Sequence, residues 1–155
     1  MADPVSVTTR IEASPEVVYD LVSDLPRMGE LSPENTGGKW LGGATGPTVG
    51  ARFKGTNRNG IRRWSTVCTV VDATPGEVFS FDVKAGPWTV ARWTYRITPS
   101  GAGCDVTETW EDRRAGWMNT VGGLASGVKD RATHNEAGMR ATLERLKAAA
   151  EVHAG

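Results

Sequence analysis

Glu108 is the residue whose surroundings most clearly suggest chemistry. In the stretch "CDVTETWED" (104–112), the alternation of a half-buried strand places Glu108 on one face with Val106 and Trp110. An unpaired carboxylate on an apolar face is costly, so it needs a cationic partner or a proton. Two interpretations follow. Glu108 forms an ion pair with an arginine such as Arg131, or it contacts a ligand as an acid with a raised pKa.

Tyr95 and His134 are the other residues that could move protons, and with Glu108 they are the candidate catalytic residues. No nucleophile–base pair or oxyanion-hole motif accompanies them, and a single histidine is more often a packing or capping residue than a base. No cluster of His, Cys or carboxylate side chains has the spacing of metal ligands, so we expect neither a metal nor another cofactor. Cys68 and Cys104 stand alone, which predicts two buried thiols in a reducing cytosol.

Strands are the elements that must position most of these side chains. The period-two alternation predicts a first strand in "VSVTTRI" and six more after a helical interruption. The expected strands are 5–11, 37–43, 51–57, 62–74, 78–83, 88–98 and 104–112. Turn residues such as Asn59-Gly60 join the later strands as consecutive hairpins, which predicts an antiparallel meander.

Two helical regions flank the meander. Ser14 is a good N-cap and Pro15 suits the first helical position, so a short helix is expected through Val22, with a further turn at 28–31. Near the C-terminus, the segment 128–151 has one apolar stripe at helical spacing, which predicts a long helix. The residues of that stripe are Met139, Leu143, Leu146 and Ala150.

Composition limits the function classes. Eighteen basic and eighteen acidic residues cancel, so the chain lacks the positive field that a nucleic-acid or anionic-membrane binder needs. No signal segment and no run of ~18 apolar residues is present, which predicts a cytoplasmic protein without stable membrane insertion. With no repeat or linker, residues 1–155 are expected to form one α+β domain in which the long helix lies across the sheet.

The chain resembles a large family in four stretches: "IEASPEVVYDLVSD", "RMGELSPE", "GARFKGTNRNGIRRWSTVCTVVDATPGEVFSF" and "HNEAGMRATLERLKAAAE". They are similar to the START-like, or SRPBCC, superfamily, which contains lipid-transfer domains, birch-pollen-type allergens and bacterial polyketide cyclases. Within it they look like an actinobacterial branch labelled polyketide cyclase/dehydrase-like. The resemblance implies a helix-grip fold, in which a curved antiparallel sheet wraps around the C-terminal helix and leaves a cavity.

The apolar faces of the strands are expected to line that cavity, with a volume of at least a few hundred Å³. A plain core packed against the helix is the alternative. We expect Leu143 opposite the sheet wall. The candidate ligand-binding residues are Phe53, Asn57, Trp64, Thr66, Phe79, Phe81, Trp93, Tyr95, Val106, Glu108, Trp110, Arg131, Asn135 and Met139.

Two segments could border the cavity opening. "RMGELSPE" contains Glu30 and Glu34, which we interpret as solvated charges. The Gly-rich stretch within 113–127 combines apolar side chains with glycines, and this composition is typical of a mobile gate.

Three functions remain open. The sequence favours a carrier or sensor that binds a small, mostly hydrophobic molecule of lipid or polyketide type. The alternative is an enzyme of the cyclase or dehydratase type that uses an acid in the pocket. A protein-interaction module is the second alternative. The only partner expected is the small molecule; the sequence does not fix the oligomeric state.

Overall fold

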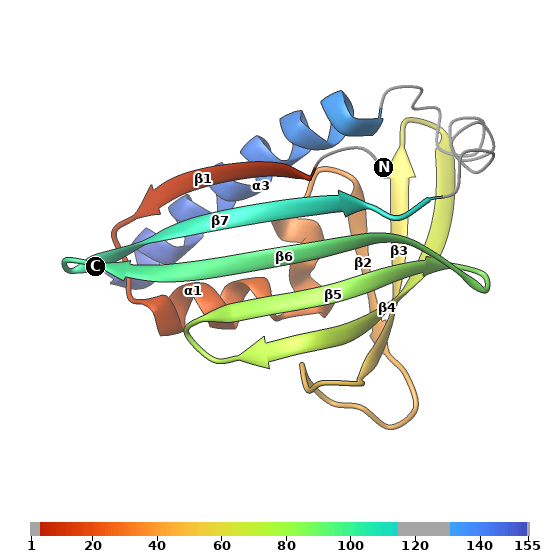
Figure 1. Cartoon of the computed structure of the whole chain (residues 1–155), viewed down its shortest axis with the longest axis horizontal. Coiled ribbons are helices and arrows are strands. Elements are labelled where there is room, and N and C mark those ends of the chain that lie inside the picture. The colour runs from red at the N-terminus through yellow and green to blue at the C-terminus, as the bar shows by residue number, and fades with distance from the viewer. Residues whose placement is uncertain (1–3, 115–130, 155) are drawn as a thin grey trace.

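Seven antiparallel strands form one sheet in the computed structural model, which describes residues 4–114 and 131–154 (Figure 1). The order across the sheet is β1-β7-β6-β5-β4-β3-β2, so β2 to β7 form the predicted meander and β1 pairs with β7. The strands are β1 (Val5–Ile11), β2 (Asn35–Trp40), β3 (Arg52–Asn59), β4 (Arg62–Thr74), β5 (Val78–Ala85), β6 (Trp88–Ser100) and β7 (Gly103–Asp112).

Most predicted strand bounds are confirmed to within two residues. The exception is β2, which was expected at 37–43 but lies at Asn35–Trp40. In the hairpin between β3 and β4, Asn59 still pairs with Arg62, and the two turn residues are Gly60 and Ile61. Gly60 has a positive φ of 63°, and Asn59 does not have a positive φ.

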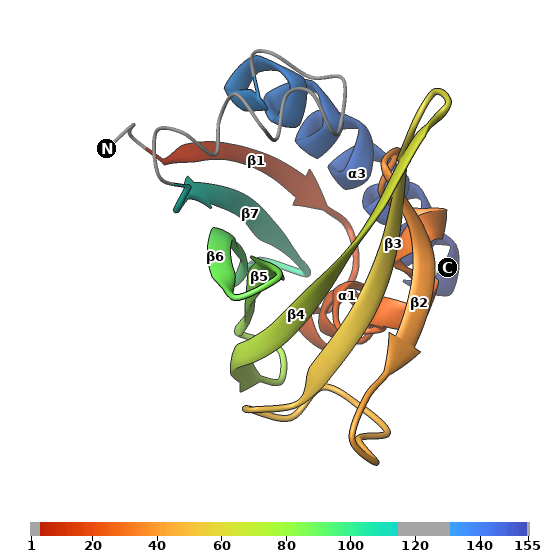
Figure 2. The same ribbon diagram turned by 90° about the vertical axis from the view of Figure 1, so that its right-hand side faces the viewer.

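The sheet curls because its ladders are interrupted at several points. Register shifts lie between Val70 and Asp72 in β4 and between Val83 and Lys84 in β5, and such bulges bend a strand and increase its twist. Figure 2 shows β2, β3 and β4 turned away from β5, β6 and β7, so that the sheet has a concave face. At Gly38, a Cβ would lie 2.0 Å from the backbone oxygen of Lys54, so a side chain cannot fit at this point of the pairing between β2 and β3.

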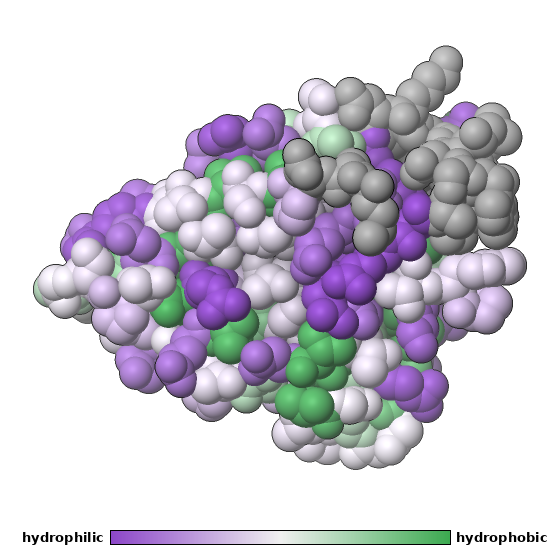
Figure 3. All heavy atoms as spheres, in the orientation of Figure 1, coloured by the Kyte–Doolittle hydropathy of each residue, from purple (hydrophilic) through white to green (hydrophobic). Residues whose placement is uncertain are grey.

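The concave and outer faces of the sheet differ in polarity, as the alternation predicts. On the outer face, Ser6 bonds Thr109 at 2.9 Å and Thr8 bonds Thr107 at 2.8 Å between their side-chain oxygens. Figure 3 shows that the residues on this face are mostly hydrophilic or neutral, and that fewer hydrophobic residues lie among them. The concave face therefore carries the apolar surface that the helices cover.

Two short helices follow β1. Helix α1 (Pro15–Val22) begins as predicted, with the Ser14 hydroxyl accepting a hydrogen bond from the backbone N–H of Val17 at 3.3 Å. The expected turn at 28–31 is a 3₁₀ helix, η1, at Leu25–Glu30. Val18 and Val22 of α1 are fully buried. The two helices therefore fill one end of the concave face.

Helix α3 (Arg131–Ala154) lies across the concave side and packs on β1 and α1 (Figure 1). It ends three residues after the predicted bound of 151, and residues 128–130 lie outside the described part of the chain. The apolar stripe is confirmed, because its members are at most 1% exposed. They are Met139, Leu143, Leu146 and Ala150. The fold is the expected α+β arrangement of a curved antiparallel sheet around a long C-terminal helix.

Candidate ligand-binding site

A cavity of about 550 Å³ lies between the concave face of the sheet and α3. This volume is within the range of small-molecule sites, so the alternative of a plain core is wrong. Eleven of the fourteen candidate ligand-binding residues line it: Asn57, Trp64, Thr66, Phe81, Trp93, Tyr95, Glu108, Trp110, Arg131, Asn135 and Met139.

Phe53, Phe79 and Val106 do not line the cavity but lie in the core, at most 1% exposed. The ring of Tyr19 from α1 packs edge-on against Phe79, with 6.2 Å between centroids, so α1 fills the concave face there. Leu143, expected opposite the sheet wall, is also a core residue. The alternation identified the correct face, but it could not show how far along each strand the helices fill that face.

Several lining residues were not among the candidates. Met28 comes from η1, Ala91 from β6, and Gly138 and Thr142 from α3. Gly138 and Thr142 follow Asn135 and Met139 by roughly one helical turn each, so helical spacing was a signal that could have identified them. Met28 had no such signal, because its place depends on how η1 packs against the sheet.

Glu108 and Tyr95 form a buried pair in the wall of the cavity. They are cross-strand neighbours on β7 and β6, and the Tyr95 hydroxyl donates a hydrogen bond to Glu108 Oε2 at 2.8 Å. Glu108 is 2% exposed and Tyr95 3%. The other carboxyl oxygen, Oε1, has no hydrogen-bond partner within residues 4–114 and 131–154.

This environment changes the acidity of both groups. Burial raises the pKa of Glu108 to about 8, and the hydrogen bond from Tyr95 offsets only part of that increase. Burial, with the neighbouring Glu108 carboxyl, raises the pKa of Tyr95 well above 10.0. At pH 7 the pair is therefore mostly a neutral carboxylic acid beside a neutral phenol, and Glu108 can act as a hydrogen-bond donor.

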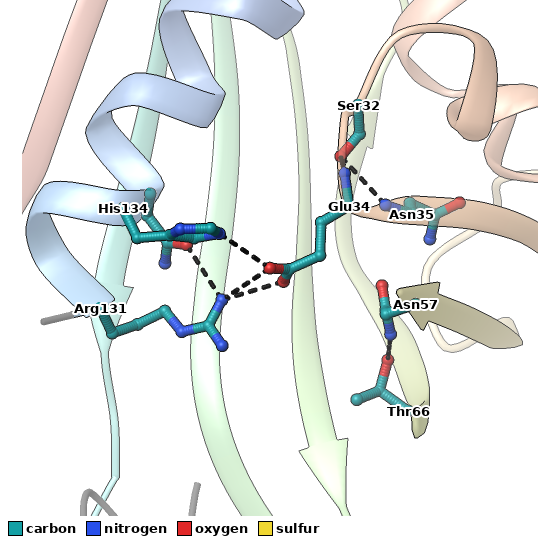
Figure 4. Close-up of polar contacts among 8 residues, drawn as sticks. Ser32, Glu34, Asn35, Asn57, Thr66, Arg131 and His134 are labelled. Carbon is teal, nitrogen blue, oxygen red and sulfur yellow. Dashed lines mark hydrogen bonds and ion pairs between the residues drawn. The ribbon is translucent and has the colours of Figure 1, made fainter. Parts of the chain in front are cut away.

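Arg131 does not pair with Glu108, which corrects one of the two interpretations made from the sequence. Its Nη1 lies 2.9 and 3.1 Å from the two carboxylate oxygens of Glu34. His134 Nε2 lies 2.9 Å from Glu34 Oε2, so the helix holds this carboxylate with two side chains (Figure 4). The interpretation of Glu34 as a solvated charge is therefore wrong, because its side chain is only 24% exposed.

We call Glu34, Arg131 and His134 the mouth cluster, since all three line the cavity and His134 is 39% exposed. The cluster joins the first turns of α3 to the segment between η1 and β2 (Figure 4). Glu30, the last residue of η1, instead pairs with Arg27 at 2.7 Å on the exposed surface. Glu30 therefore fits the interpretation of a solvated charge, and Glu34 does not.

Two arginines of the cavity wall lie over tryptophan rings. The guanidinium of Arg131 is 5.9 Å from the ring centroid of Trp64, and that of Arg114 is 5.9 Å from the ring of Trp110. Arg114 also makes a two-point ion pair with Asp112, at 2.8 Å for each N···O distance. Both guanidinium groups are therefore paired with carboxylates.

The remaining candidates have plain roles in the structure. Asn57 Nδ2 donates to Thr66 Oγ1 at 3.3 Å, and both side chains line the cavity.

Cys68 and Cys104 are free, buried thiols, as predicted. Burial raises the pKa of Cys68 to about 12.

No group of metal-ligating side chains gathers in the described residues. The expected gate at 113–127 lies outside the described residues, except for Arg113 and Arg114.

The sheet, the long helix and the cavity between them define a helix-grip fold. The chain belongs to the family described as polyketide cyclase/dehydrase and lipid transport, whose family model matches residues 4–151. Binding of hydrophobic ligands is associated with this family and fold. No helix among the described residues is long and apolar enough to cross a membrane.

Solved structures with the same fold come from diverse organisms. A polyketide-cyclase-like protein of Corynebacterium glutamicum is 29% identical over 99% of this chain and 95% of its own, with a TM-score of 0.66. The di-domain ARO/CYC protein StfQ of the steffimycin biosynthetic pathway is 15% identical, with a TM-score of 0.77, over 98% of this chain and 51% of its own. Major latex-like protein 151 of Panax ginseng is 13% identical over 96% and 97% of the two chains, with a TM-score of 0.70. No curated protein matches the chain.

Proposed function

We propose that the protein binds one small, mostly apolar molecule in the cavity and acts as a carrier or sensor. The observation that supports this most directly is the cavity itself, whose volume is about 550 Å³. Its wall exposes mainly apolar surface from large aromatic side chains, with polar side chains such as Asn57, Thr66 and Glu108 among them, which is how small-molecule sites provide affinity and orientation. The aromatic side chains of the wall are Trp64, Phe81, Trp88, Trp93, Tyr95 and Trp110.

Native mass spectrometry of protein purified gently from its own cells tests this proposal. We expect a bound small molecule in the wild type. Thr66→Phe should abolish the adduct, because Thr66 lines the cavity and a phenyl ring would occupy the ligand's space. Thr107→Phe is the matched control, since Thr107 bonds Thr8 on the outer face. Equal adducts in both variants would place the ligand elsewhere and contradict the proposal.

A second function, acid catalysis of the cyclase or dehydratase type, has one specific observation in its favour. Glu108 has a pKa of about 8 and lies in the cavity wall, so it could donate a proton near neutral pH. If a substrate is turned over, Glu108→Gln should keep its binding but reduce turnover on the order of a hundredfold or more. Turnover at the wild-type rate in this variant would exclude Glu108 as the catalytic acid.

The protein-interaction alternative has less support. A docking face needs a contiguous apolar patch. The large hydrophobic side chains that are exposed in the described residues come from four separate segments of the chain. They are Val49, Ile61, Trp88 and Val152.

A further inference from the structure

The orphaned oxygen of Glu108 specifies what a ligand must carry. We infer that the bound molecule presents a neutral hydrogen-bond acceptor, such as a ketone or ester carbonyl oxygen, to Glu108 Oε1. This inference rests on the proposed function, because it requires that a small molecule occupies the cavity. It goes further by naming the polar group of that molecule and the point in the wall that the group contacts.

The hydrogen bond from Tyr95 leaves Oε1 as the donor position of the neutral acid. Tyr95 already donates its hydroxyl hydrogen to Oε2, so Oε2 acts as the acceptor of the neutral carboxyl group. The acid proton then resides on Oε1, which has no partner in the described residues. A buried donor without an acceptor costs free energy, and a ligand carbonyl would remove that cost. The raised pKa of Glu108 supports the neutral form at pH 7.

The charged groups that line the cavity, apart from Glu108, are already paired. On α3, Arg131 and His134 bond Glu34, and after β7 Arg114 bonds Asp112. Beside Glu108 itself, β6 contributes the neutral Tyr95.

On the other side of β7, β1 contributes Val7 opposite Glu108, and α3 lines the cavity with Met139. An anionic ligand group would therefore meet no free cation at Glu108 among the described residues. A neutral acceptor fits this place, whereas a carboxylate would have to be desolvated without compensation.

A cationic amine is the competing chemistry, because it could bind an ionised Glu108. The two cases have opposite proton linkage. A carbonyl needs the protonated acid, so its affinity falls as the pH rises through about 8, the pKa of Glu108. An amine that remains cationic needs the carboxylate, so its affinity rises over the same interval.

Three probes with one naphthalene skeleton separate these cases. 2-Acetylnaphthalene carries a carbonyl, 1-(2-naphthyl)ethylamine carries a cation, and 2-ethylnaphthalene carries no polar group. Each is titrated at pH 6 and pH 9 while tryptophan fluorescence is followed, since Trp64, Trp93 and Trp110 line the cavity. Relative to 2-ethylnaphthalene, we expect the ketone to bind about three- to tenfold more tightly at pH 6 than at pH 9, the worth of one hydrogen bond.

Variants locate the effect at Glu108. Glu108→Gln keeps a donor but cannot titrate, so it should retain the ketone preference at both pH values. Glu108→Met should remove the preference. Glu111→Gln is the matched control, because Glu111 is on the opposite face of β7 and pairs with Arg113. It should behave as the wild type.

Three outcomes would contradict the inference, and they differ in what they imply for the proposed function. Equal binding of the ketone and 2-ethylnaphthalene at both pH values would overturn the inference and leave the proposed function intact. Tighter binding of the amine at pH 9 would also overturn it, in favour of an ion pair. Binding of none of the three probes would overturn the proposed function, and the inference with it. The wild-type pH series decides among these outcomes even if a Glu108 variant fails to fold.

Discussion

Two carboxyl groups face the same cavity and are held in opposite ways. At the opening, Glu34 lies 2.9 Å from both the Arg131 guanidinium and the His134 ring, with 24% of its side chain exposed. In the wall, Glu108 is 2% exposed and bonds only the neutral hydroxyl of Tyr95 in the described part of the chain. One carboxyl group has a guanidinium and solvent near it, and the other has neither.

The difference shows that the surroundings of a carboxyl group determine its use. The mouth cluster ties α3 to the segment before β2, and its cost of burial is offset by opposite charge. At Glu108 there is no such compensation, so burial favours the neutral acid instead. The cavity therefore tolerates charge at its opening and disfavours it at Glu108.

The largest expected effect is the pH dependence of the free energy of unfolding. The pKa of Glu108 is about 8 in the folded protein, above its ordinary value of 4.5, so the folded state keeps a proton that the unfolded chain loses. This contribution to the free energy of unfolding is full below pH 4.5 and disappears as the pH rises through about 8. It is on the order of 5 kcal/mol.

Urea denaturation between pH 4 and 9 measures this slope. Glu108→Gln should flatten it relative to the wild type, and Glu111→Gln should leave it unchanged. A wild-type slope that survives Glu108→Gln would show that other groups cause it.

Matched charge reversals compare the two regions directly. Glu108→Lys places an ammonium group in the apolar wall without a carboxylate partner, and we expect a loss of about 3–5 kcal/mol in the free energy of unfolding. Glu34→Lys places the same group beside Arg131 and His134, but near water, so the loss should be about 1–2 kcal/mol. Chemical denaturation at pH 7 measures both. Equal losses would mean that the two sites do not differ in solvation.

The mouth cluster should respond to salt. Glu34→Gln removes the charge that Arg131 and His134 share, and we expect a loss of about 1 kcal/mol at low salt, because the cluster is partly exposed. In 1 M NaCl the difference from the wild type should shrink. Glu30→Gln, on the exposed pair with Arg27, is the control and should have no measurable effect. A salt-independent loss would indicate packing and not charge.

The smallest expected effect belongs to Tyr95→Phe. Its hydroxyl lowers the pKa of Glu108, so removing it should move the pH at which the contribution is fully lost further above 8. The free energy of unfolding should fall by less than about 1 kcal/mol, because one hydrogen bond is lost while the ring remains. The same urea series detects the shift. A shift to lower pH would show that the hydroxyl does not stabilise the ionised acid.

Sequence reasoning succeeded where one backbone period determines the result. The alternation in β7 placed Glu108 on the concave face with Val106 and Trp110, and the apolar spacing in α3 identified the buried stripe. Both results depend only on residues close together in the chain.

Long-range partners could not be predicted in this way. Arg131 pairs with Glu34, 97 positions away, and nothing local distinguishes that carboxylate from Glu108. Phe79 and Val106 share the face of the lining residues, yet the helices fill the sheet where they lie. Each of these facts depends on how elements pack after they form, and the local pattern contains no information about it.

The two cysteines give the protein an internal reporter of occupancy. Cys68 lines the cavity, whereas Cys104 is fully buried in the core and its thiol lies 3.5 Å from the backbone oxygen of Ala13. Because the pKa of Cys68 is about 12, little thiolate exists at neutral pH and alkylation is slow. A molecule seated in the cavity would slow it further while leaving Cys104 unaffected. The ratio of alkyl adducts at the two thiols, read by peptide mass, is therefore a chemical footprint of the filled state that requires no added dye.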